Sequence, residues 1–158
     1  MKKAQLFQQP IFYIFILIVA ALFLTFGVRT IFQLKDRADV IDLSNTVQDL
    51  KDVIGTYYSF EYGSSKQITI SFNPKIEYIC FTNNAPANIP SVLNKYGDLG
   101  KLFSLSKNNM FLFPVTAFKQ NAFSIDYLKS QEDPLCFQNP LKAVITNRGD
   151  YVEISKNI

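Results

Sequence analysis

The sequence predicts an α+β protein, with an N-terminal transmembrane helix that continues into an amphipathic helix and is followed by a small antiparallel β-rich domain. Three observations predict this. Residues 11–28 are apolar at every position except Thr25. After them, apolar residues recur every three or four positions as far as Tyr57, which is typical of a helix with one apolar face. Beyond Ser65 the spacing changes to two, which is typical of strands.

The composition excludes several classes of function. Of 158 residues, 48% are hydrophobic and 18% charged, so the chain holds one domain of ordinary size and one appendage, not a large multidomain enzyme. The net charge of +3 is too small and too evenly scattered for a nucleic-acid-binding surface, and no nucleic-acid partner is expected. The chain has no His, and two Cys alone cannot complete a zinc site. We therefore expect no metal, no cofactor and no His-dependent catalysis.

The N-terminal apolar stretch is long enough to span a bilayer. At about 1.5 Å per residue, residues 11–28 cover about 27 Å, close to the roughly 30 Å of hydrocarbon in a membrane. A cleaved secretory signal has a shorter apolar core and a small-x-small site, whereas Ala20-Ala21 is followed by further apolar residues. The core helix of a soluble protein would have a polar face. We predict a single membrane span, preceded by a short cytoplasmic segment or leader at residues 1–10.

Cysteine usage predicts the side of the membrane on which the domain lies. Basic residues flank both ends of the span, so the positive-inside count is nearly balanced. Cys80 and Cys136 lie in a β-patterned domain without metal partners and are most simply a disulfide, which persists in an oxidising compartment. The alternative is two separate buried thiols. We place the C-terminal domain outside the cytoplasm, anchored in the cell membrane with the N-terminus inside.

Residues 29–62 are predicted to form an amphipathic helix or stalk. Its apolar positions fall in two series, Ile31, Leu34, Ala38 and Ile41, and then Val40, Leu43, Val47, Leu50, Ile54 and Tyr57. This stripe could lie on its own domain or on a neighbouring molecule. It shifts near residues 40–45, where Asp42, Ser44 or Asn45 could cap a second helix, with Gln48 completing a capping box. The helix is therefore either continuous or broken there.

An aromatic group follows this helix. Gly55 and the run to Gly63 mark the helix end. The aromatic side chains are Tyr57, Tyr58, Phe60 and Tyr62. They could form a stacking surface for a carbohydrate, although aromatic side chains between a helix and a sheet are more often packing residues.

Residues 63–158 predict about six to eight strands. Residues 67–72 alternate cleanly, and residues 76–81 continue after an Asn73-Pro74-Lys75 turn, so these stretches are predicted to pair as a hairpin. Ile76, Tyr78 and Cys80 would share one face of the second strand. Residues 83–90 form a turn-rich loop by composition, and residues 95–107 are ambiguous.

The remaining strands are bounded by turn signals. Residues 110–113 predict a short buried strand stopped by Pro114. Phe123, Ile125 and Tyr127 would share one face of another strand, and Cys136 follows a polar turn at residues 131–134. Finally, residues 141–146 and 151–154 flank Asn147-Arg148-Gly149-Asp150, which predicts a terminal hairpin.

No set of residues supports a catalytic site. Ser104 and Lys107 match a Ser-x-x-Lys pattern, in which the lysine would activate a serine nucleophile, but the companion motifs are missing. Glu132 and Asp133 are adjacent before a proline, and sequence neighbours do not face each other across a substrate. Residues 97–100 lack the glycine density and the lysine of a phosphate-binding loop. We interpret all three as turns and expect no enzyme.

At the N-terminus, Lys3-Ala4-Gln5 directly ahead of a hydrophobic helix resembles the class III signal of archaeal type IV pilins and archaellins. In that family a membrane peptidase cuts after a small residue preceded by Lys or Arg, which implies a processing site between Ala4 and Gln5. Removing the basic residues would free the helix to pack with identical helices in a filament. The chain departs from the family at Gln9, where a glutamate often pairs with a neighbour's amine, and at Pro10.

Two functional hypotheses follow. The first is a pilin-like subunit of a surface filament or secretion-type assembly, in contact with membrane lipid and with copies of itself or other pilin-like subunits through the N-terminal helix. The second is a permanently anchored single-pass envelope protein whose β domain binds a protein or a glycan. A third class stays open, namely an accessory subunit of a membrane complex or an enzyme with an unrecognised site.

Overall fold

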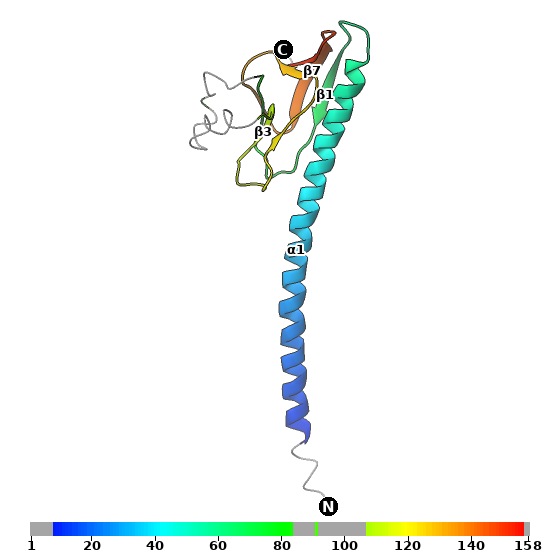
Figure 1. The fold of residues 1–158 in the computed structure, drawn as a ribbon. Helices are drawn as coiled ribbons and strands as arrows, with labels where there is room; N and C mark the ends of the chain where they lie inside the picture. The colour runs from blue at the N-terminus through cyan, green and yellow to red at the C-terminus, as the bar shows by residue number, and fades with distance from the viewer. Residues whose placement is uncertain (1–7, 84–90, 92–106, 157–158) are drawn as a thin grey trace, which may run out of the picture. The chain divides into compact units, whose positions relative to one another are not determined.

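The structure of the protein, a computed structural model, describes residues 8–83, 91 and 107–156. The chain divides into two compact units, Met1–Ile41 and Asp42–Ile158. The described elements are the helix α1 (Gln8–Tyr58) and the strands β1 (Ser65–Ile70), β2 (Tyr78–Phe81), β3 (Met110–Phe113), β4 (Ala122–Phe123), β5 (Leu128–Ser130), β6 (Leu135–Gln138), β7 (Leu141–Asn147) and β8 (Val152–Lys156). The fold is therefore α+β, as predicted, with one long helix ahead of the strands (Figure 1).

The helix α1 runs without a break from Gln8 to Tyr58. No second helix begins near residues 40–45, so the continuous alternative is the one that the chain adopts. The Gln48 amide does not complete a capping box but donates to Asp52 Oδ1 at 2.8 Å, one turn further along the same helix. The boundary between the two compact units falls inside this helix, after Ile41.

The first sheet has the strand order β1-β7-β8-β5. Strand β7 pairs antiparallel with both β1 and β8, and β5 joins β8 in parallel. The predicted terminal hairpin is confirmed as β7 and β8, and Gly149 in its turn has a φ of 87°, a conformation that glycine adopts without steric cost. Leu141, Ala143 and Ile145 of β7 are buried while Lys142 is exposed, so one face of this strand carries the core.

The second sheet has the order β4-β3-β2-β6, with every pair antiparallel. All four residues of β3 are buried, which confirms the short buried strand expected at residues 110–113. On β2, Cys80 lies directly opposite Cys136 of β6, and the two form a disulfide, as predicted. Because the bond joins residues 56 positions apart, it stabilises the domain by about 4 kcal/mol in the chain-entropy description.

The hairpin predicted from residues 67–72 and 76–81 is wrong. Strand β1 pairs with β7, whereas β2 pairs with β3 and β6, so the two stretches belong to different sheets. The Ile76 amide does donate to the Asn73 carbonyl at 2.9 Å, but this turn carries the chain from one sheet to the other. Ile76 lies in the main core and Cys80 in a smaller cluster, so they do not share a face either. Local alternation cannot distinguish these two outcomes.

The single strand predicted through Phe123, Ile125 and Tyr127 is also wrong. Strand β4 ends at Phe123, and β5 begins only at Leu128. Between these strands, the backbone of Ile125 bonds to the Asn109 side chain and not to a neighbouring strand. The Asn109 Oδ1 accepts from the Ile125 amide and the Nδ2 donates to the Ile125 carbonyl, both at 2.8 Å. Tyr127 has a φ of 62°, which ends an extended run. Ile125 is therefore buried and Tyr127 exposed.

One main core joins α1 to both sheets. The helix contributes Leu43, Val47, Leu50 and Ile54, whose alternating spacing of four and three places them on one face. Successive residues of a strand point to opposite faces of its sheet. In β3, Met110 and Leu112 accordingly face the main core, while Phe111 and Phe113 form a smaller cluster with Cys80. The apolar residues of the helix therefore pack in the domain core from Leu43 onwards.

Candidate functional site

The candidate site is the surface of the first part of α1, residues 12–41, which we call the exposed helix. Its large apolar side chains are exposed around the whole circumference of the helix. Phe12, Leu17 and Leu24, for example, are between 63% and 69% exposed. None of the most apolar stretch of this helix is buried within the protein. By length and composition the helix can cross a membrane. A core helix of a soluble domain would be mostly buried.

The two threonine hydroxyl groups of the exposed helix donate to carbonyls of the helix itself. Thr25 Oγ1 donates to the carbonyls of Ala21 and Leu22, at 3.0 and 2.9 Å. Thr30 Oγ1 donates to the Phe26 carbonyl at 2.9 Å. Hydrocarbon offers no hydrogen-bond partners, so a hydroxyl there needs an acceptor on its own helix. Neither threonine would leave an unpaired donor in an apolar medium.

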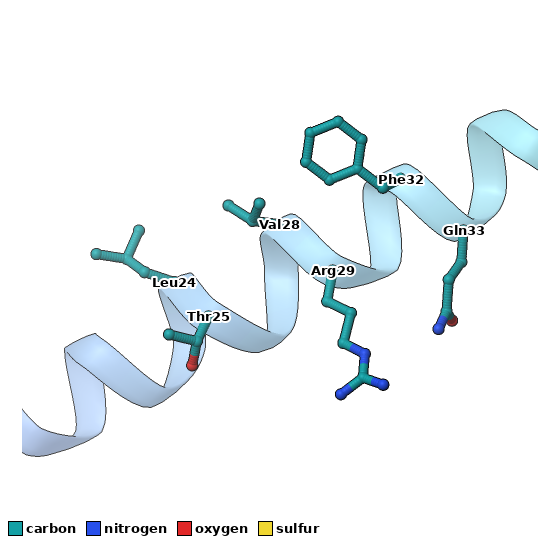
Figure 2. A pocket seen from close by; sticks show the side chains of 6 residues that line it. All are labelled: Leu24, Thr25, Val28, Arg29, Phe32 and Gln33. Atoms are coloured by element: carbon teal, nitrogen blue, oxygen red, sulfur yellow. The ribbon is translucent and has the colours of Figure 1, made fainter.

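The end of the apolar run shows where the surface chemistry changes. Figure 2 shows Leu24, Val28 and Phe32 in one row of side chains along the helix and Thr25, Arg29 and Gln33 in the neighbouring row. Each row follows the spacing of four that aligns side chains along a helix. All six residues line one shallow depression on a single helix, so no second wall encloses a ligand. The helix is apolar all round before this point and two-sided after it.

The other end of α1 is fixed by a buried asparagine. Asn147 is 1% exposed, and its Nδ2 donates to the carbonyls of Tyr57, Tyr58 and Phe60 at 2.8, 3.1 and 2.8 Å. The last carbonyls of a helix have no partner within the helix, so these bonds satisfy them. The Asn147 Oδ1 also accepts from the Gly149 amide at 2.6 Å. One side chain therefore joins the helix end to the β7–β8 turn.

Aromatic side chains surround this helix end. The rings of Tyr58 and Tyr127 stack with centroids 4.0 Å apart, and those of Tyr57 and Phe60 lie 4.9 Å apart. Phe60, Tyr62 and Tyr127 are 50%, 74% and 54% exposed, so these three present aromatic surface to solvent. Tyr57 and Tyr58 instead pack against the main core. The aromatic group named from the sequence thus divides into two packing residues and two exposed ones, with Tyr127 added.

A charged pair lies beside this aromatic surface. Arg148 donates to Glu153 Oε2 from both Nη2, at 2.7 Å, and Nε, at 3.1 Å. The hydrogen bond and the charge of Glu153 raise the pKa of Arg148 above its ordinary value, with a smaller contribution from Tyr62. The guanidinium is therefore a fixed positive charge next to an exposed ring.

A polar groove of about 370 Å³ lies between the 71–78 loop and the 138–140 turn. Its shape depends on Asn139, whose Oδ1 accepts from the Phe72 amide at 3.1 Å and whose Nδ2 donates to the Ile76 carbonyl at 3.0 Å. Glu77 is the one carboxylate among its lining residues. A single carboxylate beside uncharged groups does not supply the acid and base of a hydrolytic site.

The residues singled out from the sequence fall into two groups. Lys3, Ala4, Gln5, Ser104 and the 97–100 stretch lie outside the described residues. Glu132 and Asp133 lie between β5 and β6, and the Thr82 hydroxyl donates to Asp133 Oδ1, so this carboxylate has a structural role. In the described ranges, no group of three His, Cys, Asp or Glu side chains could hold a metal ion.

Comparison with protein families, with curated proteins and with solved structures gave no match to this chain.

Proposed function

We propose that this chain is a single-span membrane protein whose residues 11–28 cross the cell membrane and whose β domain lies outside the cytoplasm. It acts through structure or interaction, and we propose no catalytic activity. The observation that carries the proposal is the exposed helix, in which apolar side chains face outwards in every direction from Phe12 to Val28. Only a solvent that is apolar on all sides suits such a surface.

The energetics favour lipid over water for this stretch. Full removal of a Leu, Ile or Phe side chain from water contributes about 1.5–3 kcal/mol. The residues at its two ends suit a membrane boundary, because Tyr13 has an amphipathic ring and Arg29 is the first charge after the apolar run. The Thr25 hydroxyl donates to carbonyls of its own helix, so placing this side chain in hydrocarbon leaves no unpaired hydroxyl at residue 25.

The disulfide supports an orientation. Cys80 and Cys136 are bonded, and structural disulfides persist in oxidising compartments outside the cytoplasm. Because the bonded cysteines belong to the unit that follows the span, we place the β domain outside the cytoplasm and the N-terminus inside.

The form of this function that we propose first is a pilin-like subunit of a surface filament or secretion-type assembly. The resemblance at Lys3-Ala4-Gln5 supports it, since cleavage there would free the apolar helix from its basic flank. The partners would be membrane lipid and other copies or pilin-like subunits.

A second candidate is a permanently anchored envelope protein whose β domain binds a protein or a glycan. The exposed rings of Phe60, Tyr62 and Tyr127 favour it, because flat aromatic faces beside a fixed cation such as Arg148 can stack on a sugar or anchor a protein contact. In this case the N-terminal basic residues would be retained.

The mature N-terminus of the protein in its native membrane distinguishes the two candidates. Intact mass or terminal sequencing that begins at Gln5 supports recognition by a pilin-type peptidase and the filament role. A chain that begins at Met1 contradicts the pilin-like form and leaves the permanent anchor. Non-reducing mass spectrometry of the same sample should show Cys80 linked to Cys136, and two free thiols would contradict the proposed compartment.

A further inference from the structure

We propose that residues 17–41 of α1 form a parallel, in-register seam with the same residues of a second copy of this chain. The proposal rests on the proposed function, because two copies held in one membrane in the same orientation are necessarily parallel. The second copy is the occupant of this surface, and the sequence spacing, the exposed side chains and the charges described below each support it.

The spacing of apolar residues along α1 predicts the seam. Positions that alternate three and four apart fall on one stripe of a helix and repeat every seven residues. The seam positions are Leu17, Ala20, Leu24, Gly27, Ile31, Leu34, Ala38 and Ile41. This repeat spans more than three heptads without an interruption by a polar residue. Such a repeat imposes a left-handed supercoil on a helix pair.

The polar residues after the span fall away from this stripe. Between residues 30 and 41, all four seam positions are apolar, whereas the off-seam positions are Thr30, Phe32, Gln33, Lys35, Asp36, Arg37, Asp39 and Val40. Only two of those eight are apolar. A helix embedded in lipid would show no such division, so this part of the surface is built for a protein partner on one side and water on the other.

The seam side chains beyond Val28 need a cover that lipid does not give. Ile31, Leu34 and Ile41 are 65%, 60% and 60% exposed, although they follow the predicted span. The stripe stops after Ile41, because the next heptad positions are the exposed polar residues Asn45 and Gln48. From Leu43 onwards the helix turns a different face into its own core.

Charge complementarity selects a second copy in parallel as the partner. In a parallel pair, the residue just before one seam position contacts the residue five positions further along the other helix. Arg37 and Asp42 have this separation, opposite charges and exposed side chains. Two parallel copies would therefore form two Arg37–Asp42 pairs, one on each side of the seam.

Inside the apolar run, small residues lie on the same stripe. Ala20 and Gly27 are seam positions, and small side chains let helices approach closely in a membrane. A Cβ added at Gly27 would meet nothing within 4 Å of its own chain, so the space beside it is open for a second helix.

Oxidative cross-linking of the full chain in its native membrane tests the seam. The two variants are Leu34→Cys, on the seam, and Val40→Cys, which is off the seam but also apolar and exposed. For two copies held parallel in one membrane, identical seam positions face each other when the pair is in register. Leu34→Cys should therefore give several-fold more covalent dimer than Val40→Cys. Wild-type protein, whose two cysteines are already bonded to each other, gives the baseline. Equal yields from the two variants would overturn the seam.

A charge exchange tests the polar pair independently. Arg37→Asp or Asp42→Arg alone should lower the yield of Leu34→Cys dimer several-fold, and the double exchange should restore it. Failure of the double exchange to restore dimer would contradict the Arg37–Asp42 pairing. Retention of each variant in carbonate-washed membranes separates the two proposals. A chain that stays in the membrane without preferential cross-linking at residue 34 overturns the seam alone, whereas a chain that washes off overturns the membrane anchor and the seam together.

Discussion

The two parts of α1 carry apolar side chains of similar kinds but place them in opposite surroundings. Before Asp42, large residues such as Leu24 and Ile31 are more than half exposed. After it, Leu50 and Ile54 are completely buried, and Val53 between them also packs against the main core. One continuous helix therefore supplies both an outward-facing apolar surface and one wall of a domain core. A continuous helix can therefore have different roles along its length.

The stability of the β domain should depend on residues 42–58 of α1 and should not depend on residues 12–41. The disulfide, the buried helix face and the Asn147 cap all belong to the unit that begins at Asp42. Substitutions in that unit should lower its melting temperature, and matched substitutions in the exposed helix should not.

The largest effect is expected from loss of the disulfide. Replacing Cys80 and Cys136 together by Ser should lower the free energy of unfolding of the domain by about 4 kcal/mol, because the unfolded chain is no longer constrained. Near-UV circular dichroism of the full chain in detergent follows the domain, and the far-UV signal of the exposed helix should persist after the domain has melted. An unchanged domain transition would contradict the stabilising role of the bond.

The next effect compares the same substitution in the two parts of the helix. Leu50→Ala removes a completely buried side chain and should cost about 2–5 kcal/mol of domain stability, since the packed core closes only partly around the cavity. Leu22→Ala, at a position that is 52% exposed, should leave the domain transition unchanged. Equal losses from the two variants would break the division of α1.

A smaller loss is expected from the helix cap. Asn147→Ala would leave the carbonyls of Tyr58 and Phe60 without their side-chain donor, at a cost of about 1–3 kcal/mol. Asn45→Ala, at an exposed position of the same helix, is the control and should not destabilise the domain. Thermal melts of both variants measure the difference. A melt of Asn147→Ala that overlays wild type would show that water replaces the amide.

The smallest effect is expected from the surface ion pair. Glu153→Gln should shift the melting temperature only slightly, because Arg148 is open to solvent and its charge is screened. Glu153 raises the pKa of Arg148, so the stability that this guanidinium contributes is present below its ordinary pKa and is lost only as pH rises through the raised value, far above neutrality. The difference between Glu153→Gln and wild type should therefore not change between pH 6 and 8, and a change in that range would contradict the assignment.

The sequence predicted best what depends on neighbouring residues. The helix end near Tyr58, the buried strand at residues 110–113 and the terminal hairpin all follow from local spacing and turn residues. The disulfide partners were also correct, because the chain has only two cysteines.

The failures concern contacts between distant parts of the chain. Whether β1 pairs with β2 or with β7 depends on packing across the core, which local alternation does not report. The side chains of Asn109 and Asn139 hold loops through bonds to backbone far away in sequence, and an asparagine beside a turn gives no sign of its partner. In the candidate site, the exposed apolar run was predictable from composition alone. The stacking of Tyr127 on Tyr58 was not, because it needs the left-handed backbone at residue 127.

The central claim is that residues 11–28 span the membrane with the β domain outside the cytoplasm. A membrane-impermeant amine reagent applied to intact cells, followed by carbonate washing of the membranes and mass mapping, tests it directly, since the chain has no lysine between Lys3 and Lys35. We predict that the exposed Lys66 and Lys129 are modified in intact cells and that the modified chain stays in the washed membranes. Modification of these lysines only after the cells are opened, or release of the chain by carbonate, would contradict the account.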